Sequence, residues 1–219
     1  LLLTLLMFSC GQNGKDPVTD ESNASSDVNK TSELNLDDPK VLKSIIAKSV
    51  EIKVMEKEPP HSEKLIYVDD KISSYSGWAK LVRGGKVSEL CEVKDDYRSG
   101  VRIRWHANGN KYNQQTCKEG KIHGFGTTWH LNGVKAAEGF YFEDVGKDQL
   151  YTQWNTAGQK TSEEVFDKGN LISAVHWKPN GDKCPISNVE EGNGIAVWYN
   201  EDGTEMSRAT YKDGKRVQD

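Results

Sequence analysis

The strongest constraint in this sequence of 219 residues is a repeated motif that pairs an aromatic residue with a glycine. A tryptophan, three further residues and a glycine recur four times, and the matching glycines lie 23 to 25 residues apart. A looser copy precedes them at Leu81–Gly85, and a copy with one inserted residue follows at Trp198–Gly203. A fixed period in this range is typical of a repeat array. The four regular copies are Trp105–Gly109, Trp129–Gly133, Trp154–Gly158 and Trp177–Gly181.

The residues between these motifs predict hairpins. A second glycine turn follows each motif about half a period later, as at Gly120. Asn-Gly flanked by alternating residues is a strong hairpin signal, and alternation places Val101, Ile103 and Trp105 on one face of a strand. Connections this short cannot make the crossover that parallel strands require. We therefore predict a mainly β protein, an antiparallel β-meander of about six hairpin repeats and twelve strands, forming a single extended twisted sheet over residues 77–219.

A short helix is expected ahead of the repeats, over residues 39–50. Asp38 suits the N-cap, and Pro39 suits the first helical position. We predict an amphipathic helix that packs on the sheet and belongs to a helix and cap region, 39–76. The apolar positions at helical spacing are Val41, Leu42, Ile45, Ile46 and Val50.

The first ten residues are an apolar run that ends in a small residue and Cys10. This pattern resembles the hydrophobic region and lipobox of a bacterial lipoprotein signal, in which the cysteine is acylated and becomes the new N-terminus. The resemblance implies that residues 1–9 are part of a signal peptide and that Cys10 is the lipidation site. A buried or disordered apolar N-terminus is the alternative.

The negative charge of the chain is concentrated behind that cysteine. Residues 10–38 hold seven acidic and two basic side chains and no periodic apolar positions, which predicts a disordered acidic tether. The remaining residues, 39–219, carry a net charge of +1. Such a body is not suited to coat phosphates, so nucleic acid is not an expected partner. No stretch of 18 apolar residues is present, so the sequence predicts no membrane-spanning helix.

The repeat units resemble a known family. Units of the form G-x-x-x-x-W-x-x-N-G-x-K, followed by a polar strand and a second glycine turn, are similar to the MORN-repeat variant, whose bacterial members are often labelled YwqK-type, antitoxin-like proteins. Gly100–Lys111 and Gly124–Lys135 are the copies that match this form best. The resemblance covers residues 77–219 and implies the hairpin architecture. It implies no activity, because the motif residues are those that form turns and strands.

No catalytic or metal-binding group stands out. His106 and His130 occupy the same repeat position, so a meander holds them about 10 Å apart, too far to share a metal. We expect both to be solvated histidines, and we expect no metal and no cofactor. Phosphate-loop, nucleophile-elbow and His-Glu-x-x-His motifs are absent from the sequence.

Cysteines and glutamates are expected to play ordinary roles. An odd number of cysteines remains after Cys10, which argues against a full disulfide framework. We expect free thiols or at most one bridge at Cys91, Cys117 and Cys184. We expect solvated carboxylates at Glu89, Glu138, Glu163 and Glu164.

The function expected from these features is non-enzymatic. We expect a lipid-anchored protein of a bacterial cell envelope, facing the periplasm or in the outer membrane if there are two membranes, whose repeat sheet binds an unknown protein or serves as a scaffold. The alternatives are an antitoxin or immunity-type protein that neutralises a toxin and, third, a carbohydrate-active enzyme with paired carboxylates. The tryptophans are expected mainly to hold neighbouring strands together. The candidate binding surface consists of Trp105, Trp129, Trp154, Trp177, Trp198, His106 and His130.

Overall fold

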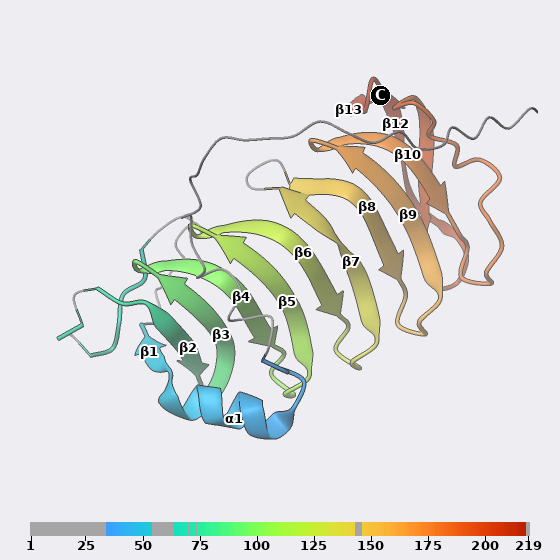
Figure 1. Cartoon of the computed structure of the whole chain (residues 1–219). Helices are drawn as coiled ribbons and strands as arrows, with labels where there is room; N and C mark the ends of the chain where they lie inside the picture. Colours follow the sequence, from blue (N-terminus) through green and yellow to red (C-terminus); the bar gives the residue numbers. More distant parts are fainter. Residues whose placement is uncertain (1–33, 54–63, 70, 73, 143–145, 218–219) are drawn as a thin grey trace, which may run out of the picture. The chain divides into compact units, whose positions relative to one another are not determined.

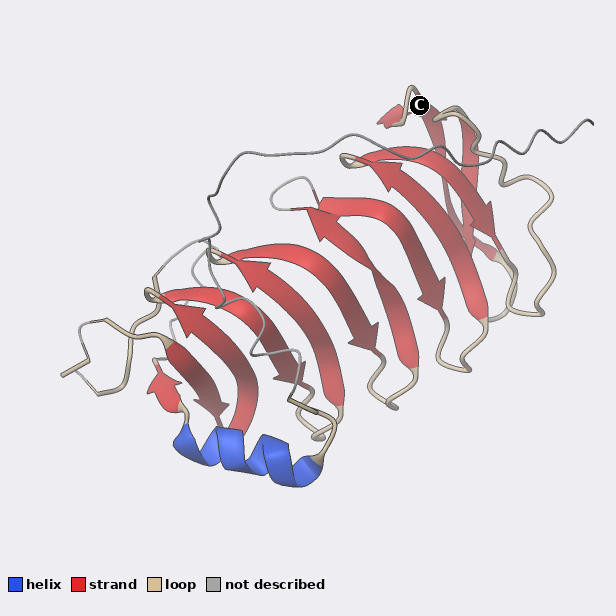
Figure 2. Cartoon of the chain, viewed as in Figure 1, coloured by secondary structure: helices blue, strands red, loops and turns tan. Residues whose placement is uncertain are grey.

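The computed structural model describes residues 34–53, 64–69, 71–72, 74–142 and 146–217. The predicted signal segment, the lipidated Cys10 and most of the predicted tether lie outside these residues. The described part holds one helix and thirteen strands (Figures 1 and 2). Their bounds are α1 Pro39–Lys48, β1 Val50–Ile52, β2 Gly77–Arg83, β3 Lys86–Lys94, β4 Tyr97–Trp105, β5 Lys111–Lys118, β6 Lys121–Trp129, β7 Lys135–Phe142, β8 Gly146–Trp154, β9 Lys160–Asp167, β10 Asn170–His176, β11 Gly194–Tyr199, β12 Glu205–Lys212 and β13 Lys215–Val217.

The predicted meander is confirmed. Strands β1 to β10 form one open sheet in chain order, and every neighbouring pair from β2 to β10 is antiparallel. Strand β1 is the exception, since it pairs in parallel with β2 at the edge of the sheet. Twelve strands, β2 to β13, lie in the repeat region that begins at Gly77.

The expectation of a single sheet needs correction. Strands β11, β12 and β13 form a separate three-stranded sheet, and β10 is joined to them through a loop from residue 177 to residue 193. Pro179 and Pro185 lie in this loop. Pro179 lies in a turn that the other copies also form, closed by the Gly181 N–H to the Lys178 carbonyl. Pro185 lies two residues after Lys183, where the next strand would run, and it has no backbone N–H to donate to a ladder, so this segment does not continue the sheet.

Helix α1 begins where the sequence predicts. The Asp38 carboxylate accepts a hydrogen bond from the Lys40 backbone N–H at 2.8 Å, and Pro39 is the first helical residue. The helix ends at Lys48 rather than at residue 50, because Val50 already pairs with Ala79 of β2. Among the described residues, no helix is long and apolar enough to cross a membrane.

The hairpins are joined to one another at their turns. The Asn108 side-chain amide donates to the Leu131 carbonyl at 2.8 Å, and the Asn132 amide donates to the Thr156 carbonyl at 2.9 Å. Asn108 and Asn132 occupy the same position in successive copies of the motif. Each side chain bonds to the turn of the next copy. In these two copies the asparagine of the motif therefore links one turn to the next in addition to shaping its own turn.

Two small cores lie at the ends of the ten-stranded sheet. Both involve the side chains that alternate with the tryptophan positions along the strands. The first contains Ile52, Leu65, Tyr67, Ala79, Leu81, Cys91 and Val93. The second joins β10 to β11 and contains Leu171, Ala174, Val189 and Ala196.

A buried ion cluster lies next to the first core. Glu89 of β3 contacts Arg98 at 2.7 Å and Arg102 at 2.6 Å through its two carboxylate oxygens, and all three side chains are buried. The expectation of a solvated Glu89 is therefore wrong, because two arginines of β4 converge on it. Burial opposes ionisation of Glu89, but the two guanidinium groups outweigh it and lower its pKa to about 2.

We predict that Glu89→Gln lowers the free energy of unfolding at pH 7 by roughly 3–5 kcal/mol, because it leaves two buried guanidinium groups without a counter-charge. The ordinary pKa is 4.5, so the ionised Glu89 stabilises the fold above pH 4.5, and this contribution is lost as the pH falls towards 2. Urea denaturation of both proteins at several pH values should show their difference shrinking over that range. Equal stability at pH 7 would contradict the prediction, and the exposed Glu119→Gln is the matched control.

Candidate functional site

One face of the ten-stranded sheet carries a row of tryptophans, and we call it the tryptophan face. Trp105, Trp129 and Trp154 are the last residues of β4, β6 and β8, and Trp177 follows β10 directly. A register shift of the strand pairing occurs just before each of the first three. The repeat therefore places the same residue type at the same point of successive hairpins.

A lysine from the preceding strand lies over each of three indole rings. Lysines interact favourably with the face of an indole at this distance. The rings are therefore part of the packing between strands, as the sequence predicted, and they are half-buried. The pairs are Lys111 over Trp129 at 5.7 Å from the ring centroid, Lys135 over Trp154 at 5.2 Å and Lys160 over Trp177 at 5.4 Å.

The same lysines are held by polar groups three residues further along their strands. Lys135 contacts Glu138 at 2.6 Å, and Lys160 forms the equivalent ion pair with Glu163. These two glutamates are half-exposed. The ion pairs leave this part of the face with little net charge. In the third equivalent pair, Gln114 takes the place of the glutamate and accepts a hydrogen bond from Lys111. The charge partner of Lys111 is Asp37, at 2.6 Å.

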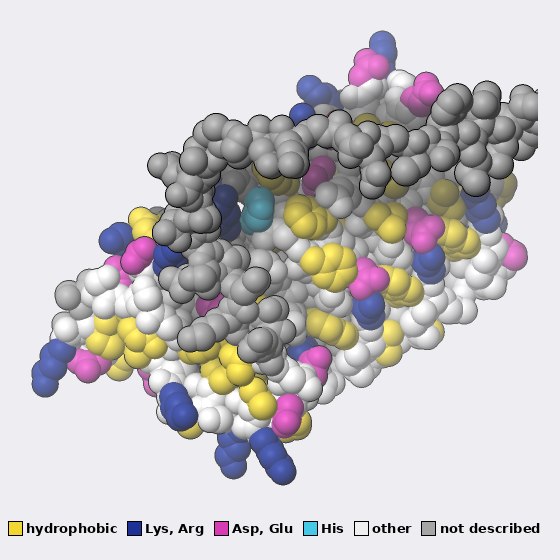
Figure 3. Space-filling view, viewed as in Figure 1, with side chains coloured by type: hydrophobic (Ala, Val, Ile, Leu, Met, Phe, Trp, Pro, Cys, Tyr) yellow, Lys and Arg dark blue, Asp and Glu magenta, His cyan; other side chains and the backbone are white. Residues whose placement is uncertain are grey.

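A second row on the tryptophan face is apolar and exposed. Phe125 is 55% exposed, Leu150 is 52% exposed and Val165 is 37% exposed. Phe125 faces Phe140 across β6 and β7, and Leu150 faces Val165 across β8 and β9. We call Phe125, Phe140, Leu150 and Val165 the apolar row. Figure 3 shows hydrophobic side chains alternating with lysine and acidic side chains over this part of the sheet.

The two candidate histidines are not simply solvated. His106 Nε2 lies 3.0 Å from the Trp129 carbonyl oxygen, and His130 Nε2 lies 2.9 Å from the Trp154 carbonyl oxygen. Both rings are half-buried. Each ring joins its own turn to the next one, so the expectation of freely solvated histidines is wrong. The repeat contacts between turns require them at this position.

Trp198 does not continue the tryptophan row. It lies in β11 of the small sheet, where its ring centroid is 5.0 Å from that of His176 in an edge-to-face arrangement. It also packs against the second core. The structure therefore brings four of the five candidate tryptophans onto one face and uses the fifth between the two sheets.

A buried serine, histidine and glutamate that were not predicted from the sequence meet at this junction. His176 Nδ1 lies 2.6 Å from Ser187 Oγ, and its Nε2 lies 3.4 Å from a Glu164 oxygen. The Ser187 hydroxyl also accepts a hydrogen bond from the Val197 N–H at 3.2 Å, and the three side chains are at most 5% exposed. Because the hydroxyl is buried and already bonded, this group joins the two sheets. The one available signal was that His176 directly precedes Trp177, which places it on the opposite face.

Glu164 is a second glutamate for which the expectation of solvation is wrong. Lys147 contacts its other oxygen at 3.1 Å. Burial raises its pKa, but the contact with His176 and the nearby Lys147 charge outweigh burial, so the net shift is downward. The carboxylate therefore stays ionised at neutral pH.

The described cysteines are free, as expected. Cys91, Cys117 and Cys184 are all buried. Burial raises the pKa of the Cys91 thiol to about 12. The thiol therefore stays protonated at neutral pH and is not activated as a nucleophile. Within the described ranges, no group of three histidine, cysteine or acidic side chains is placed to hold a metal ion.

No protein-family model matches this chain, and no curated protein matches it either. The β-meander is observed directly, whereas membership of the MORN-variant family stays a prediction from motifs such as Gly124–Lys135.

We predict that Trp129→Ala lowers the free energy of unfolding by about 2 kcal/mol, since the half-buried ring loses its contacts with Lys111 and the neighbouring strand. Phe125→Ala, four residues earlier in β6 and on the same face, should change it by less than about 1 kcal/mol because its ring is largely exposed. Urea denaturation of the two variants measures both values. Equal losses would show that the two rows do not differ in their role.

Proposed function

We propose that this chain is a non-enzymatic, lipid-anchored protein of a bacterial cell envelope whose tryptophan face binds another protein. The observation that carries this proposal is the exposed apolar row. Contiguous exposed apolar side chains rimmed by polar ones are typical of protein interaction sites. Phe125 and Leu150 are each more than half exposed, although both lie within regular strands.

Size and charge support a protein as the partner. The apolar row crosses β6 to β9, and Val101 of β4 lies on the same face beyond Thr116 of β5. From β4 to β9 this face extends over roughly 25 Å at about 4.8 Å per strand. This width suits a protein interface of ordinary size. Since Lys135 and Lys160 are paired with their own glutamates, contact with the partner would depend on apolar complementarity more than on electrostatic steering.

The proposed location rests on the sequence ahead of the sheet. An apolar run ending in Cys10, followed by an acidic segment to residue 38, suits an acylated anchor and a tether. Over 29 residues such a tether reaches roughly 30 Å on average. The tryptophan face would then bind its partner close to the membrane surface.

The binding proposal is tested with the full chain by cross-linking in the native cell and identification of the captured protein by mass spectrometry. The double variant Phe125→Asp/Leu150→Asp should lose the captured partner at least about tenfold, because it places two charges in an apolar contact. The matched control is Met206→Asp, since Met206 is 59% exposed on β12 of the other sheet. Capture that is unchanged in the double variant, or lost equally in the control, contradicts the proposal.

The anchor is tested separately by Cys10→Ala. We expect the wild type to fractionate with membranes and to incorporate a labelled fatty acid, and we expect the variant to do neither. Metabolic labelling and membrane fractionation measure this. A wild type that stays soluble and unlabelled contradicts the envelope location and favours the antitoxin-type alternative.

A further inference from the structure

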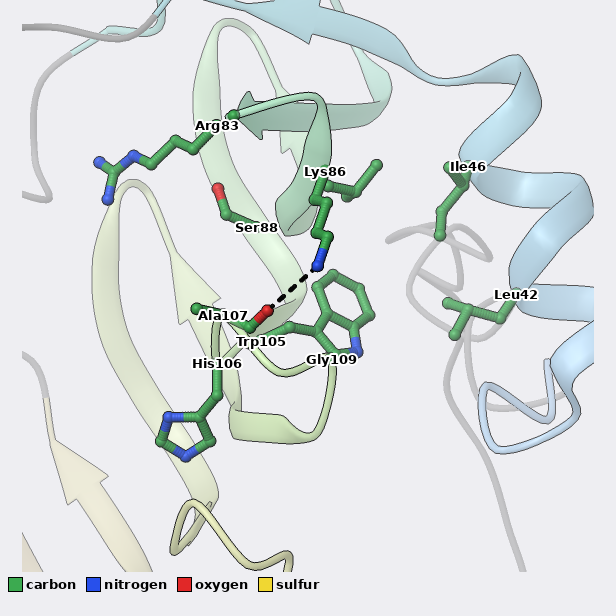
Figure 4. A pocket seen from close by; sticks show the side chains of 11 residues that line it. Leu42, Ile46, Arg83, Lys86, Ser88, Trp105, His106, Ala107 and Gly109 are labelled. Atoms are coloured by element: carbon green, nitrogen blue, oxygen red, sulfur yellow. Dashed lines mark hydrogen bonds between the residues drawn. The ribbon is translucent and has the colours of Figure 1, made fainter.

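A hollow of about 640 Å³ lies between helix α1 and the first hairpins of the sheet. Leu42 and Ile46 extend into it from the helix, and the indole of Trp105 lies across from them (Figure 4). Val87 of β3 adds a further apolar wall. Its size falls within the range of small-molecule sites, which are concave and mostly apolar with a few polar groups.

The apolar side chains of the helix are not fully covered by the sheet. Helix α1 has an apolar stripe, yet none of its ten residues is buried. Lys80 fixes the last turn of the helix, since its ammonium donates to the Ile46 carbonyl at 3.1 Å. The helix is therefore attached to the sheet while Leu42 and Ile46 face an open space. Exposed apolar side chains that line a cavity favour an apolar occupant.

The polar part of the lining is cationic. The Lys86 ammonium lies beside the Trp105 indole (Figure 4) and makes a long hydrogen bond of 3.5 Å to the Ala107 carbonyl. Arg83 lies at the same end of the sheet. Among the described residues that line the hollow there is no aspartate or glutamate. A ligand head group here would therefore be negatively charged.

We propose that this hollow binds an amphiphile with an aliphatic chain and a single anionic head group. The chain lies between Leu42, Ile46 and Trp105, and the head group accepts a hydrogen bond from Lys86. Both a free fatty acid and an anionic membrane lipid carry this chemistry. The site is independent of the apolar row, which lies further along the sheet on β6 to β9.

The test uses the full chain and dodecanoate, below the concentration at which it forms micelles, in a calorimetric titration. We expect saturable binding of one dodecanoate per chain, and binding of dodecyltrimethylammonium at least about tenfold weaker, because the cationic head group meets Lys86. Lys86→Met should weaken dodecanoate binding at least about tenfold while leaving dodecanol unaffected. The control Lys118→Met changes an exposed lysine of β5 and should have no effect.

Leu42→Asp is the second variant, and it should abolish binding because it places a charge on the apolar wall. Its thermal unfolding midpoint should stay close to that of the wild type, since Leu42 is not buried. Flotation of the Cys10→Ala chain with phosphatidylglycerol vesicles separates the two sources of ligand, because this variant has no acyl anchor of its own. Flotation that depends on Lys86 assigns the site to a membrane lipid, and binding without flotation assigns it to the free acid. Absence of saturable binding, equal binding of the cationic analogue, or binding unaffected by Leu42→Asp would each overturn the proposal.

Discussion

The structure depends on hydrogen bonds that join each hairpin to the next. A single hairpin is marginally stable in water, so the strands of this sheet need neighbours on both sides. The backbone ladder supplies part of this stability, and the turns supply the rest through contacts such as Asn108 to Leu131 and His106 to Trp129. These contacts occur in two successive copies of the motif, where the asparagine and the histidine help to join one turn to the next. This explains why residues that look available for binding are engaged in the fold.

The two faces of the sheet meet different demands. One face is buried at both ends, under the first core beside Glu89 and under the second core beside His176. Helix α1 lies over the first hairpins of the tryptophan face, and Asp37 ahead of the helix contacts Lys111. Lysines lie over three indoles of the tryptophan row, whereas in the described part of the chain no lysine lies over a ring of the apolar row. On this one face, the tryptophan row therefore packs the strands together, and the apolar row is the part proposed to bind a partner.

Much of the architecture could be predicted because turns and alternation are local properties of the sequence. The spacing from Gly109 to Gly133 indicates a hairpin per repeat, and Asp38 with Pro39 marks the start of the helix. The break into two sheets was missed because the motif is still present at Trp177–Gly181, whereas Pro185, just beyond it, removes a hydrogen-bond donor from the expected next strand. The buried Glu89 was also missed, since its burial depends on Arg98 and Arg102 converging from another strand. Alternation shows which residues share a face, but it does not show which face is buried.

The central claim is that the apolar row is the surface by which this protein meets its partner. Hydroxyl-radical footprinting of the full-length protein, in intact envelopes and after purification, tests it most directly by reading side-chain exposure. Phe125, Leu150 and Val165 should be protected in the envelope and reactive when purified, while Met206 should be equally reactive in both. Equal reactivity of the apolar row in both preparations would contradict it.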